Sequence, residues 1–331
     1  MKIGVLGAGT WGIALARMLA NAGKTVTVWS AIAEEVDTLD QTRRHKNLPG
    51  MVIPEQIRFT KEIREACEDA DIVLFAVPSV FVRSTAQKAA PYISEKQIIV
   101  DVAKGIEKDT LLTMSEVISA EIPDVPVVAL SGPTHAEEVA RDLPTTIVAA
   151  HKDPAITKIV QDEFTNSVLR VYTNTDIKGV ELCGALKNII ALASGISAGL
   201  GYGDNTKAAI ITRGLAEMER LGAKLGCLDD TFLGLAGMGD LIVTATSQHS
   251  RNNRCGNLIG QGIAPEEAVK QVGMVVEGIN ALPAAMAMMK QYDVEMPITA
   301  AVNAVVNGGA DPTATVRKLM ERDTKSELLH Q

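Results

Sequence analysis

The chain has 331 residues, of which 47% are apolar, 22% are charged and only 3% are aromatic. Its net charge of −8 and its pI of about 5.3 argue against a nucleic-acid or anionic-membrane partner, because binding to phosphate groups needs a basic surface. An anionic substrate must therefore be bound by a local cluster of cations. At about 150 residues per domain, the length indicates two domains with a sizeable core.

The four cysteines and five histidines are scattered along the chain. No Cys-x-x-Cys pair is present, so zinc-site spacing is absent and no metal is expected. The first apolar run ends at a glycine turn, which indicates a strand instead of a signal peptide. The longest uncharged run, residues 188–203, is shorter than the roughly 20 residues of a membrane span. These features predict a cytoplasmic protein with reduced thiols and no membrane insertion.

The first half of the chain alternates short β-rich runs with amphipathic helices. Strands are expected at 2–6, 25–29, 72–77, 98–102, 127–130 and 146–150, with an edge strand at 169–172. Helices are expected at 11–22, 33–44, 60–66, 80–90, 110–121 and 135–141. This order is typical of a parallel sheet covered on both faces, and it predicts an α/β Rossmann-type doubly wound fold.

From Asp176 the pattern changes to long helical stretches. Helices are expected at 179–200, 205–225, 265–272, 280–290, 297–306 and 312–321. The change of hydrophobic period predicts a domain boundary near Lys178. Residues 1–178 are then a dinucleotide-binding domain, and residues 179–331 an all-α substrate domain.

A glycine-rich loop, Gly7-Ala8-Gly9-Thr10-Trp11-Gly12, follows the first strand and opens the first helix. Its glycines allow a tight turn and the close approach of backbone amides to a pyrophosphate, which the helix N-terminus also attracts. The motif alone is weak evidence, but its place between a strand and a helix makes it a strong signal. It predicts a site for NAD or NADP.

Two other informative segments also follow predicted strands directly. Lys104 comes after the strand at 98–102, and Ser131-Gly132-Pro133-Thr134 comes after the strand at 127–130. Ligands of open parallel sheets lie beyond the carboxyl ends of the strands, so both segments are candidates for a site. A solvated lysine and a plain turn are the alternative interpretations.

In the second half, polar residues interrupt segments made of Ala, Gly, Leu and Ile. Lys187 and Asn188 end one such segment, Asp240 stands in Gly-Met-Gly-Asp-Leu, and Ser250-Arg251-Asn252 follows. Burying such groups costs several kcal/mol unless they have a partner, so a ligand is expected here. A lysine in apolar surroundings can act as a general acid/base, because desolvation brings the pKa of an amine toward neutrality.

From Gly4 to about Lys318 these segments together resemble the bacterial-type NAD(P)-dependent sn-glycerol-3-phosphate dehydrogenases. The resemblance implies an oxidoreductase that interconverts sn-glycerol 3-phosphate and dihydroxyacetone phosphate and supplies phospholipid synthesis. It also implies a homodimer, and a helical domain like that of 6-phosphogluconate dehydrogenase. The chain departs from the family at His135, Cys183 and Ala245, where phenylalanine, glycine and cysteine are common, and none of these changes removes a functional group.

The resemblance also implies roles for individual residues. The expected catalytic residues are Lys187 as general acid/base, Asp240 orienting it, and Lys104. The expected substrate-binding residues are Lys104, Gly132, Thr134, Lys187, Asp240, Thr244, Ser250, Arg251 and Asn252. The expected cofactor-binding residues are Gly7, Gly9, Thr10, Trp11, Gly12, Ser30, Lys104, Ala136, Arg251, Val275 and Glu277.

Several of these residues have structural alternatives. Asp240 fits a helix N-cap, and Glu277 fits a solvated carboxylate at a helix start. Arg213 is at least as well explained by an ion pair with Glu217 or Glu181 as by catalysis.

The choice between NAD and NADP depends on the end of the second strand. Ser30 and Ala31 stand there, where many family members carry Arg or His. Glu34 and Glu35 are expected to lie too far along the next helix to accept a ribose hydroxyl, whereas Arg43 and Arg44 could reach an NADP phosphate from its far end. These features predict dual specificity, with a weaker NADP preference than in relatives that carry the arginine.

Two other functions stay open at this point. A dehydrogenase for another hydroxy acid, such as the 6-phosphogluconate or 3-hydroxyisobutyrate relatives, would share the lysine placement but not the Ser-Arg-Asn segment. A non-catalytic nucleotide sensor would have no need of Lys104, Lys187, Asp240 and Arg251.

Overall fold

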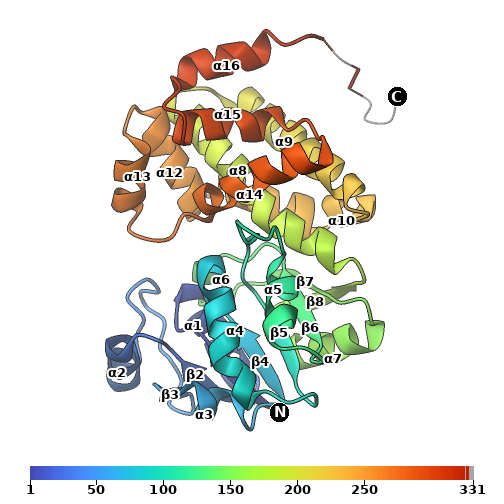
Figure 1. Ribbon diagram of the computed structural model, residues 1–331. Helices are drawn as coiled ribbons and strands as arrows, with labels where there is room; N and C mark the ends of the chain where they lie inside the picture. The colour runs from blue at the N-terminus through green and yellow to red at the C-terminus, as the bar shows by residue number, and fades with distance from the viewer. Residues whose placement is uncertain (325, 328–331) are drawn as a thin grey trace. The chain divides into compact units, whose positions relative to one another are not determined.

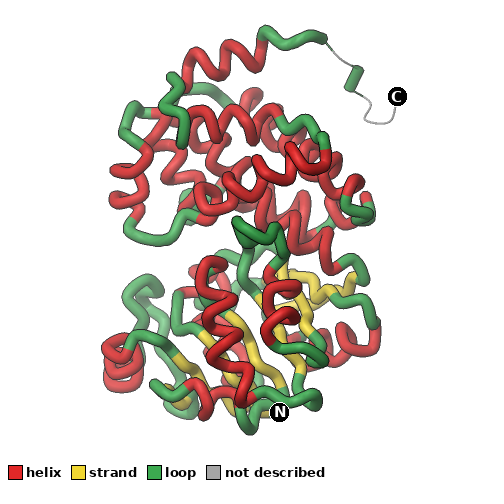
Figure 2. Tube along the Cα trace, in the orientation of Figure 1, coloured by secondary structure: helices red, strands yellow, loops and turns green. Residues whose placement is uncertain are grey.

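The computed structural model describes residues 1–324, 326 and 327. The chain forms two compact units, one of Met1–Glu107 with Leu112–Glu181, and one of Lys108–Leu111 with the chain from Leu182 onward. We call them the N-terminal and C-terminal units. Among the described residues every strand belongs to the N-terminal unit, and the C-terminal unit is helical (Figures 1 and 2).

The N-terminal unit is built on one eight-stranded sheet in the order β3-β2-β1-β4-β5-β6-β7-β8. Its strands are β1 (Lys2–Leu6), β2 (Thr25–Trp29), β3 (Arg58–Thr60), β4 (Ile72–Phe75), β5 (Ile98–Asp101), β6 (Val127–Ser131), β7 (Thr145–Ala150) and β8 (Leu169–Asn174). The expected strands are confirmed, including β8 at one edge. The short β3 at the other edge was missed, because its last residue was assigned to the following helix.

All neighbouring strands pair in parallel except β6 and β7, which are antiparallel. The prediction of a wholly parallel sheet is therefore wrong at β7 and β8, which run against the other six strands. A parallel crossover needs a dozen or more residues and usually a full helix. Only α6 (Ala136–Val139), a single helical turn, lies between β6 and β7, and it suffices for an antiparallel return.

Two apolar cores cover the two faces of this sheet, because successive residues of a strand point to opposite sides. In β4, Ile72 and Leu74 join a core with α1 (Thr10–Asn21), α2 (Ala33–Thr42), α6 and α7 (Pro154–Phe164). Val73 and Phe75 join the other core, with α3 (Ile63–Cys67), α4 (Val82–Ala89) and α5 (Met114–Glu121). Helix α7 was not predicted, although Asp153 caps it and proline opens it.

Nine helices form the described part of the C-terminal unit. They are α8 (Ile177–Gly199), which begins in the N-terminal unit, α9 (Asp204–Lys224), α10 (Asp229–Leu233), α11 (Asp240–Thr246), α12 (Arg251–Gly260), α13 (Pro265–Val272), α14 (Glu277–Tyr292), α15 (Pro297–Val306) and α16 (Pro312–Met320). The expected bounds of α13 and α15 are confirmed. A single π-helical turn, η3 (Leu235–Gly239), leads directly into α11, and neither it nor α10 and α11 was predicted as a helix.

Helices α8 and α12 touch backbone to backbone through glycines. A β-carbon on Gly195 or Gly199 would clash with the carbonyl oxygens of Asn253 and Asn257. A β-carbon on Gly256 would in turn clash with the carbonyl oxygen of Leu192. This close contact fixes the position of α12 along α8, and with it the position of Arg251 at the start of α12.

Helix α8 is long and apolar enough to cross a membrane by length and composition alone. In the fold, however, 89% of its most apolar 18-residue window is buried among other residues, as expected for the central helix of a folded domain.

Candidate active site

The glycine loop between β1 and α1 has the geometry of a phosphate cradle. Gly7 has a φ of +120°, and a β-carbon there would lie 2.6 Å from the carbonyl oxygen of Ala76, so only glycine fits. Gly12 packs against the carbonyl oxygen of Gly7 in the same way. Gly9, in contrast, faces open space, because a β-carbon there would meet no atom within 4 Å. The exposed backbone of Gly9 at the start of α1 therefore suits close approach of a dinucleotide pyrophosphate.

Ser30, directly after β2, is bound to a carboxylate. Its hydroxyl donates to Glu35 Oε2 at 2.6 Å and accepts from the backbone N–H of Ile32 at 3.2 Å. Glu35, which was expected to lie too far along α2 to accept a ribose hydroxyl, thus reaches the end of β2. One turn of helix brings its side chain back to Ser30, because helical side chains point toward the helix N-terminus.

At the far end of α2, Arg43 is engaged by neighbouring residues. The Arg43 guanidinium donates to the Ile57 carbonyl at 2.7 Å and to Asp40 at 2.8 Å, and it lies over the Phe59 ring. These contacts hold it beside β3.

The Lys104 ammonium links the ends of β5 and β6. It donates to the Gly132 carbonyl at 3.0 Å and to Thr134 Oγ1 at 2.9 Å. Gly132 has a φ of +135°, which turns the chain sharply after β6. The buried Ala136 opens α6 just beyond this turn. The structure thus brings together Lys104, Gly132 and Thr134, which the sequence had grouped only by their places after strands.

A pair of buried carboxyl groups lies near the carboxyl end of β5. It was not predicted from the sequence. Glu181, at the start of α8, accepts from the backbone N–H of Ser115 at 2.7 Å and from its hydroxyl at 2.6 Å. Burial raises the pKa of Glu181 to about 7. Burial and the neighbouring Glu181 also raise the pKa of Asp101, the last residue of β5. Asp101 lies three residues before Lys104, so the pair supports the loop that carries this lysine.

This pair predicts a pH dependence of stability. The folded protein keeps a proton on Glu181 up to a pH of about 7, whereas the unfolded chain releases it near 4.5. The free energy of unfolding should therefore fall as the pH rises from about 4.5 to about 7, by roughly 3 kcal/mol for this group. We expect Glu181→Gln to flatten the change of melting temperature over this range, while Glu55→Gln, at an exposed site, leaves it unaltered. An equally steep profile in Glu181→Gln would contradict this assignment.

In the C-terminal unit, the Lys187 ammonium of α8 is held by two side chains of α11. It donates to Asp240 Oδ1 at 2.5 Å and to Thr244 Oγ1 at 2.7 Å. Lys187 is only 5% exposed and Asp240 only 1% exposed. The Thr244 hydroxyl donates its own proton to the Asp240 carbonyl, so it meets the ammonium with a lone pair. The ammonium and the carboxylate are thus held against each other, shielded from bulk water.

A chain of amide contacts ties three helices together beside this pair. Asn252 Nδ2 donates to Asn188 Oδ1 at 2.9 Å, and the backbone N–H of Gly278 donates to Asn252 Oδ1 at 2.8 Å. Gly278 lies so close to the Asn188 carbonyl that no side chain would fit there. The contacts fix the start of α14, with Val275 and Glu277, next to Asn188. These contacts are difficult to predict from the sequence, because Asn188 and Asn252 are 64 residues apart and Asn252 and Gly278 are 26 residues apart.

Ser250 and Arg251 form the start of α12. Ser250 is the N-cap residue, and its hydroxyl accepts from the backbone N–H of Asn253 at 3.2 Å. The partly exposed Arg251 guanidinium makes no hydrogen bond or ion pair with the residues that the structure describes. A helix start that carries an uncommitted guanidinium is well suited to an anion such as a phosphate ester.

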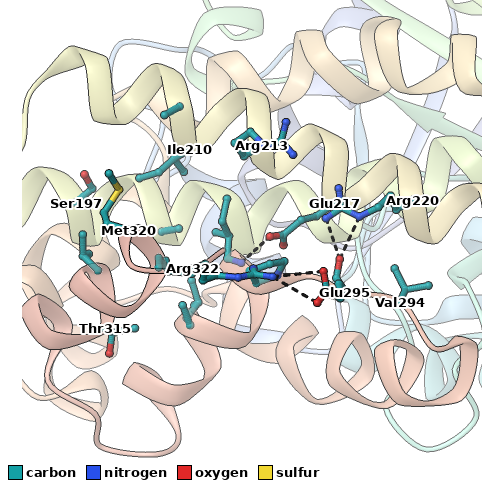
Figure 3. Close-up of a pocket in the computed structure, with 18 of the residues that line it drawn as sticks. Ser197, Ile210, Arg213, Glu217, Arg220, Val294, Glu295, Thr315, Met320 and Arg322 are labelled. Atoms are coloured by element: carbon teal, nitrogen blue, oxygen red, sulfur yellow. Dashed lines mark hydrogen bonds and ion pairs between the residues drawn. The ribbon is translucent and has the colours of Figure 1, made fainter. Parts of the chain in front are cut away.

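A cavity of about 1070 Å³ elsewhere in the C-terminal unit is distinct from these groups (Figure 3). It is lined by residues of α8, α9, α15 and α16, and not by Lys187, Asp240 or Arg251. The exposed Arg213 lines it, and over the described range no ion pair joins Arg213 to Glu217 or Glu181, so the structural alternative for Arg213 is not supported. Glu217 instead accepts from the backbone N–H groups of Ile298 and Thr299.

Comparisons with known proteins agree along the whole chain. Residues 2–157 match the family model for the N-terminus of NAD-dependent glycerol-3-phosphate dehydrogenase, and residues 176–317 match the model for its C-terminus. The chain is 68% identical to a glycerol-3-phosphate dehydrogenase [NAD(P)+] of Lactobacillus delbrueckii, over 99% of both chains. It is 49% identical to that of Bacillus subtilis, over 99% of this chain and 96% of the relative. The crystal structure of the Coxiella burnetii glycerol-3-phosphate dehydrogenase superposes with a TM-score of 0.93 at 38% identity, over 97% of this chain and 99% of that one.

Proposed function

Because the chain belongs to the NAD-dependent glycerol-3-phosphate dehydrogenase family, we propose that it interconverts dihydroxyacetone phosphate and sn-glycerol 3-phosphate with NAD or NADP. The observation that carries this proposal is the buried Lys187–Asp240–Thr244 group, because an amine that two side chains hold in one place can exchange a proton with a substrate at a fixed position. Members of the family at high identity are named for this reaction.

The glycine loop and the end of β2 would hold NAD(P)H, which would supply the hydride for the carbonyl carbon of the substrate. Lys187 gives a proton to the carbonyl oxygen in reduction and, once neutral, takes it back from the hydroxyl in oxidation. Asp240 and Thr244 hold the Lys187 amine in one orientation, through contacts of 2.5 and 2.7 Å. Asp240 thus positions the proton donor.

The phosphate ester is bound at the start of α12. Arg251 supplies the charge, and the first backbone amides of the helix supply neutral donors. Asn252 holds this turn of helix against Asn188, one residue after Lys187, so that the phosphate site keeps a fixed distance from the proton donor. Ser250 caps the same turn.

Most of the proposed cofactor contacts come from the first domain, and most of the proposed substrate contacts come from the second. Residues 1–178 bind the dinucleotide through Gly7, Gly9, Thr10, Trp11, Gly12, Ser30 and Ala136. Residues 179–331 bind the substrate, and Val275 and Glu277 contribute to the cofactor site. Lys104, with Gly132 and Thr134, serves substrate and cofactor from the ends of β5 and β6.

Three further parts of the proposal rest on the family resemblance. The enzyme is a homodimer, it works in the cytoplasm, and the glycerol 3-phosphate that it makes enters phospholipid synthesis. Sedimentation equilibrium of the purified protein tests the first part, and a mass of 35.1 kDa at all concentrations would contradict it.

The reaction itself is tested by product analysis. Dihydroxyacetone phosphate and reduced cofactor should be consumed in equal amounts, and the product should be the sn-3 enantiomer of glycerol phosphate, identified with a stereospecific coupling enzyme. Cofactor oxidation without this product would overturn the proposal.

A further inference from the structure

The Glu35 carboxylate is fixed at the carboxyl end of β2, on the side of the glycine loop. Ser30 is 6% exposed and donates its only hydroxyl proton to Glu35 at 2.6 Å, while Ile32 fixes the hydroxyl from the other side. The carboxylate therefore occupies the strand end at which dinucleotide-binding folds distinguish NAD from NADP.

The segment after α2 brings two more side chains to the same place. The imidazole of the buried His45 accepts from the backbone N–H of Asn47 at 3.2 Å, and Ala8 of the glycine loop and the Glu35 carboxylate are among its neighbours. The Asn47 side-chain amide approaches Thr10 Oγ1 of the same loop at 3.5 Å. One position is thus surrounded by Ser30, Glu35, His45 and the glycine loop, although these lie in different segments of the sequence.

The charges around Glu35 leave its carboxylate uncompensated. Burial lowers the pKa of His45, so its imidazole is neutral at pH 7. Lys46 and Arg44 are exposed, Glu34 adds a further negative charge, and Arg43 is engaged by Asp40 and Ile57. Over the described range no cation forms an ion pair with Glu35. A second anion placed here would meet the negative charge of Glu35 at close range.

We infer that Glu35 is the residue that selects NAD over NADP in this enzyme. Its free carboxylate oxygen accepts hydrogen bonds from the hydroxyls of an adenosine ribose, and its charge repels a 2′-phosphate. The Ser30 hydroxyl holds this carboxylate in place. This selection ranks the two cofactors, with NAD preferred, where the residues after β2 and at the end of α2 had predicted dual specificity. It depends only on the dinucleotide site of the proposed function.

The test is direct binding of both cofactors, measured without substrate by the fluorescence of NADH and NADPH. The wild-type protein should bind NADH at least about tenfold more tightly than NADPH. Glu35→Gln removes the charge but keeps an acceptor for Ser30, and it should shrink this ratio at least about tenfold, mainly by tightening NADPH. Glu34→Gln, a control at the neighbouring exposed glutamate, should leave the ratio within about twofold of wild type.

A wild-type protein that binds NADPH as tightly as NADH, or a Glu35→Gln variant with an unchanged ratio, would overturn the inference. Because no substrate is present, the outcome is independent of the reaction. A protein that selects NADH but does not reduce dihydroxyacetone phosphate would contradict the proposed function and leave the inference about Glu35 standing.

Discussion

Replacing Lys187 with alanine is expected to lower kcat by about 10² to 10⁴, the range typical for loss of a general acid/base. Lys187 is the amine that donates to Asp240, so in its absence a water molecule would have to supply the proton. The Kd for reduced cofactor should stay near that of the wild type, because the glycine loop and Ser30 lie outside this group. Single-turnover kinetics at saturating substrate, with the Kd measured by fluorescence, separate the two effects.

The same substitution leaves Asp240 buried without its counter-ion, which can cost about 3 to 5 kcal/mol of stability. The double variant Lys187→Met, Asp240→Asn removes both charges and keeps the volumes, so it should recover much of the melting temperature but none of the activity. Lys224→Ala, at the exposed end of α9, is the matched control and should behave as wild type. A folded Lys187→Met, Asp240→Asn variant with near-normal turnover would show that the proton moves elsewhere.

Arg251→Ala is expected to raise the KM for dihydroxyacetone phosphate by about 30- to 1000-fold, which corresponds to about 2 to 4 kcal/mol for a charge-assisted phosphate contact. The guanidinium makes no contact within the described residues that its loss would break, so the melting temperature should hardly change. The Kd for reduced cofactor should change less than the KM.

Arg254→Ala is the matched control, because Arg254 lies on the same helix but is exposed and was not assigned to the site. Its KM should equal that of the wild type. Equal effects of the two substitutions would mean that α12 attracts the substrate only through its general positive charge. An unchanged KM in Arg251→Ala would move the phosphate site away from residues 250–252.

The parts of the fold that local chemistry determines could be predicted from the sequence. Proline opens α13 and α15, and Gly273 adopts a left-handed conformation just after α13, so their ends were predicted at the observed residues. The reversed direction of β7 and β8 could not be predicted from the sequence, because it depends on how far α6 extends in the folded chain. The short π-helical turn before Asp240 has no periodic signal either, because it is made of glycine and single apolar residues.

The same distinction applies to the candidate site. The glycine loop, Lys187, Asp240 and Arg251 stand out because a motif or an apolar segment surrounds each one. Other residues do not stand out, because each looks like an ordinary polar residue in its own segment; these are Glu35, His45 and the carboxyl pair of Asp101 and Glu181. Only the folded chain shows that Glu35 reaches Ser30, and that Glu181 binds Ser115, 66 residues away.

The most direct test of the account compares dihydroxyacetone phosphate with dihydroxyacetone as substrates of the wild-type protein. The two ketones share the reacting carbonyl and differ only in the phosphate that Arg251 and the start of α12 are proposed to bind. With reduced NAD at a fixed concentration, kcat/KM should be at least about 10³-fold higher for the phosphorylated ketone. Equal values, or a preference for the unphosphorylated ketone, would contradict the assignment of both the substrate and its phosphate site.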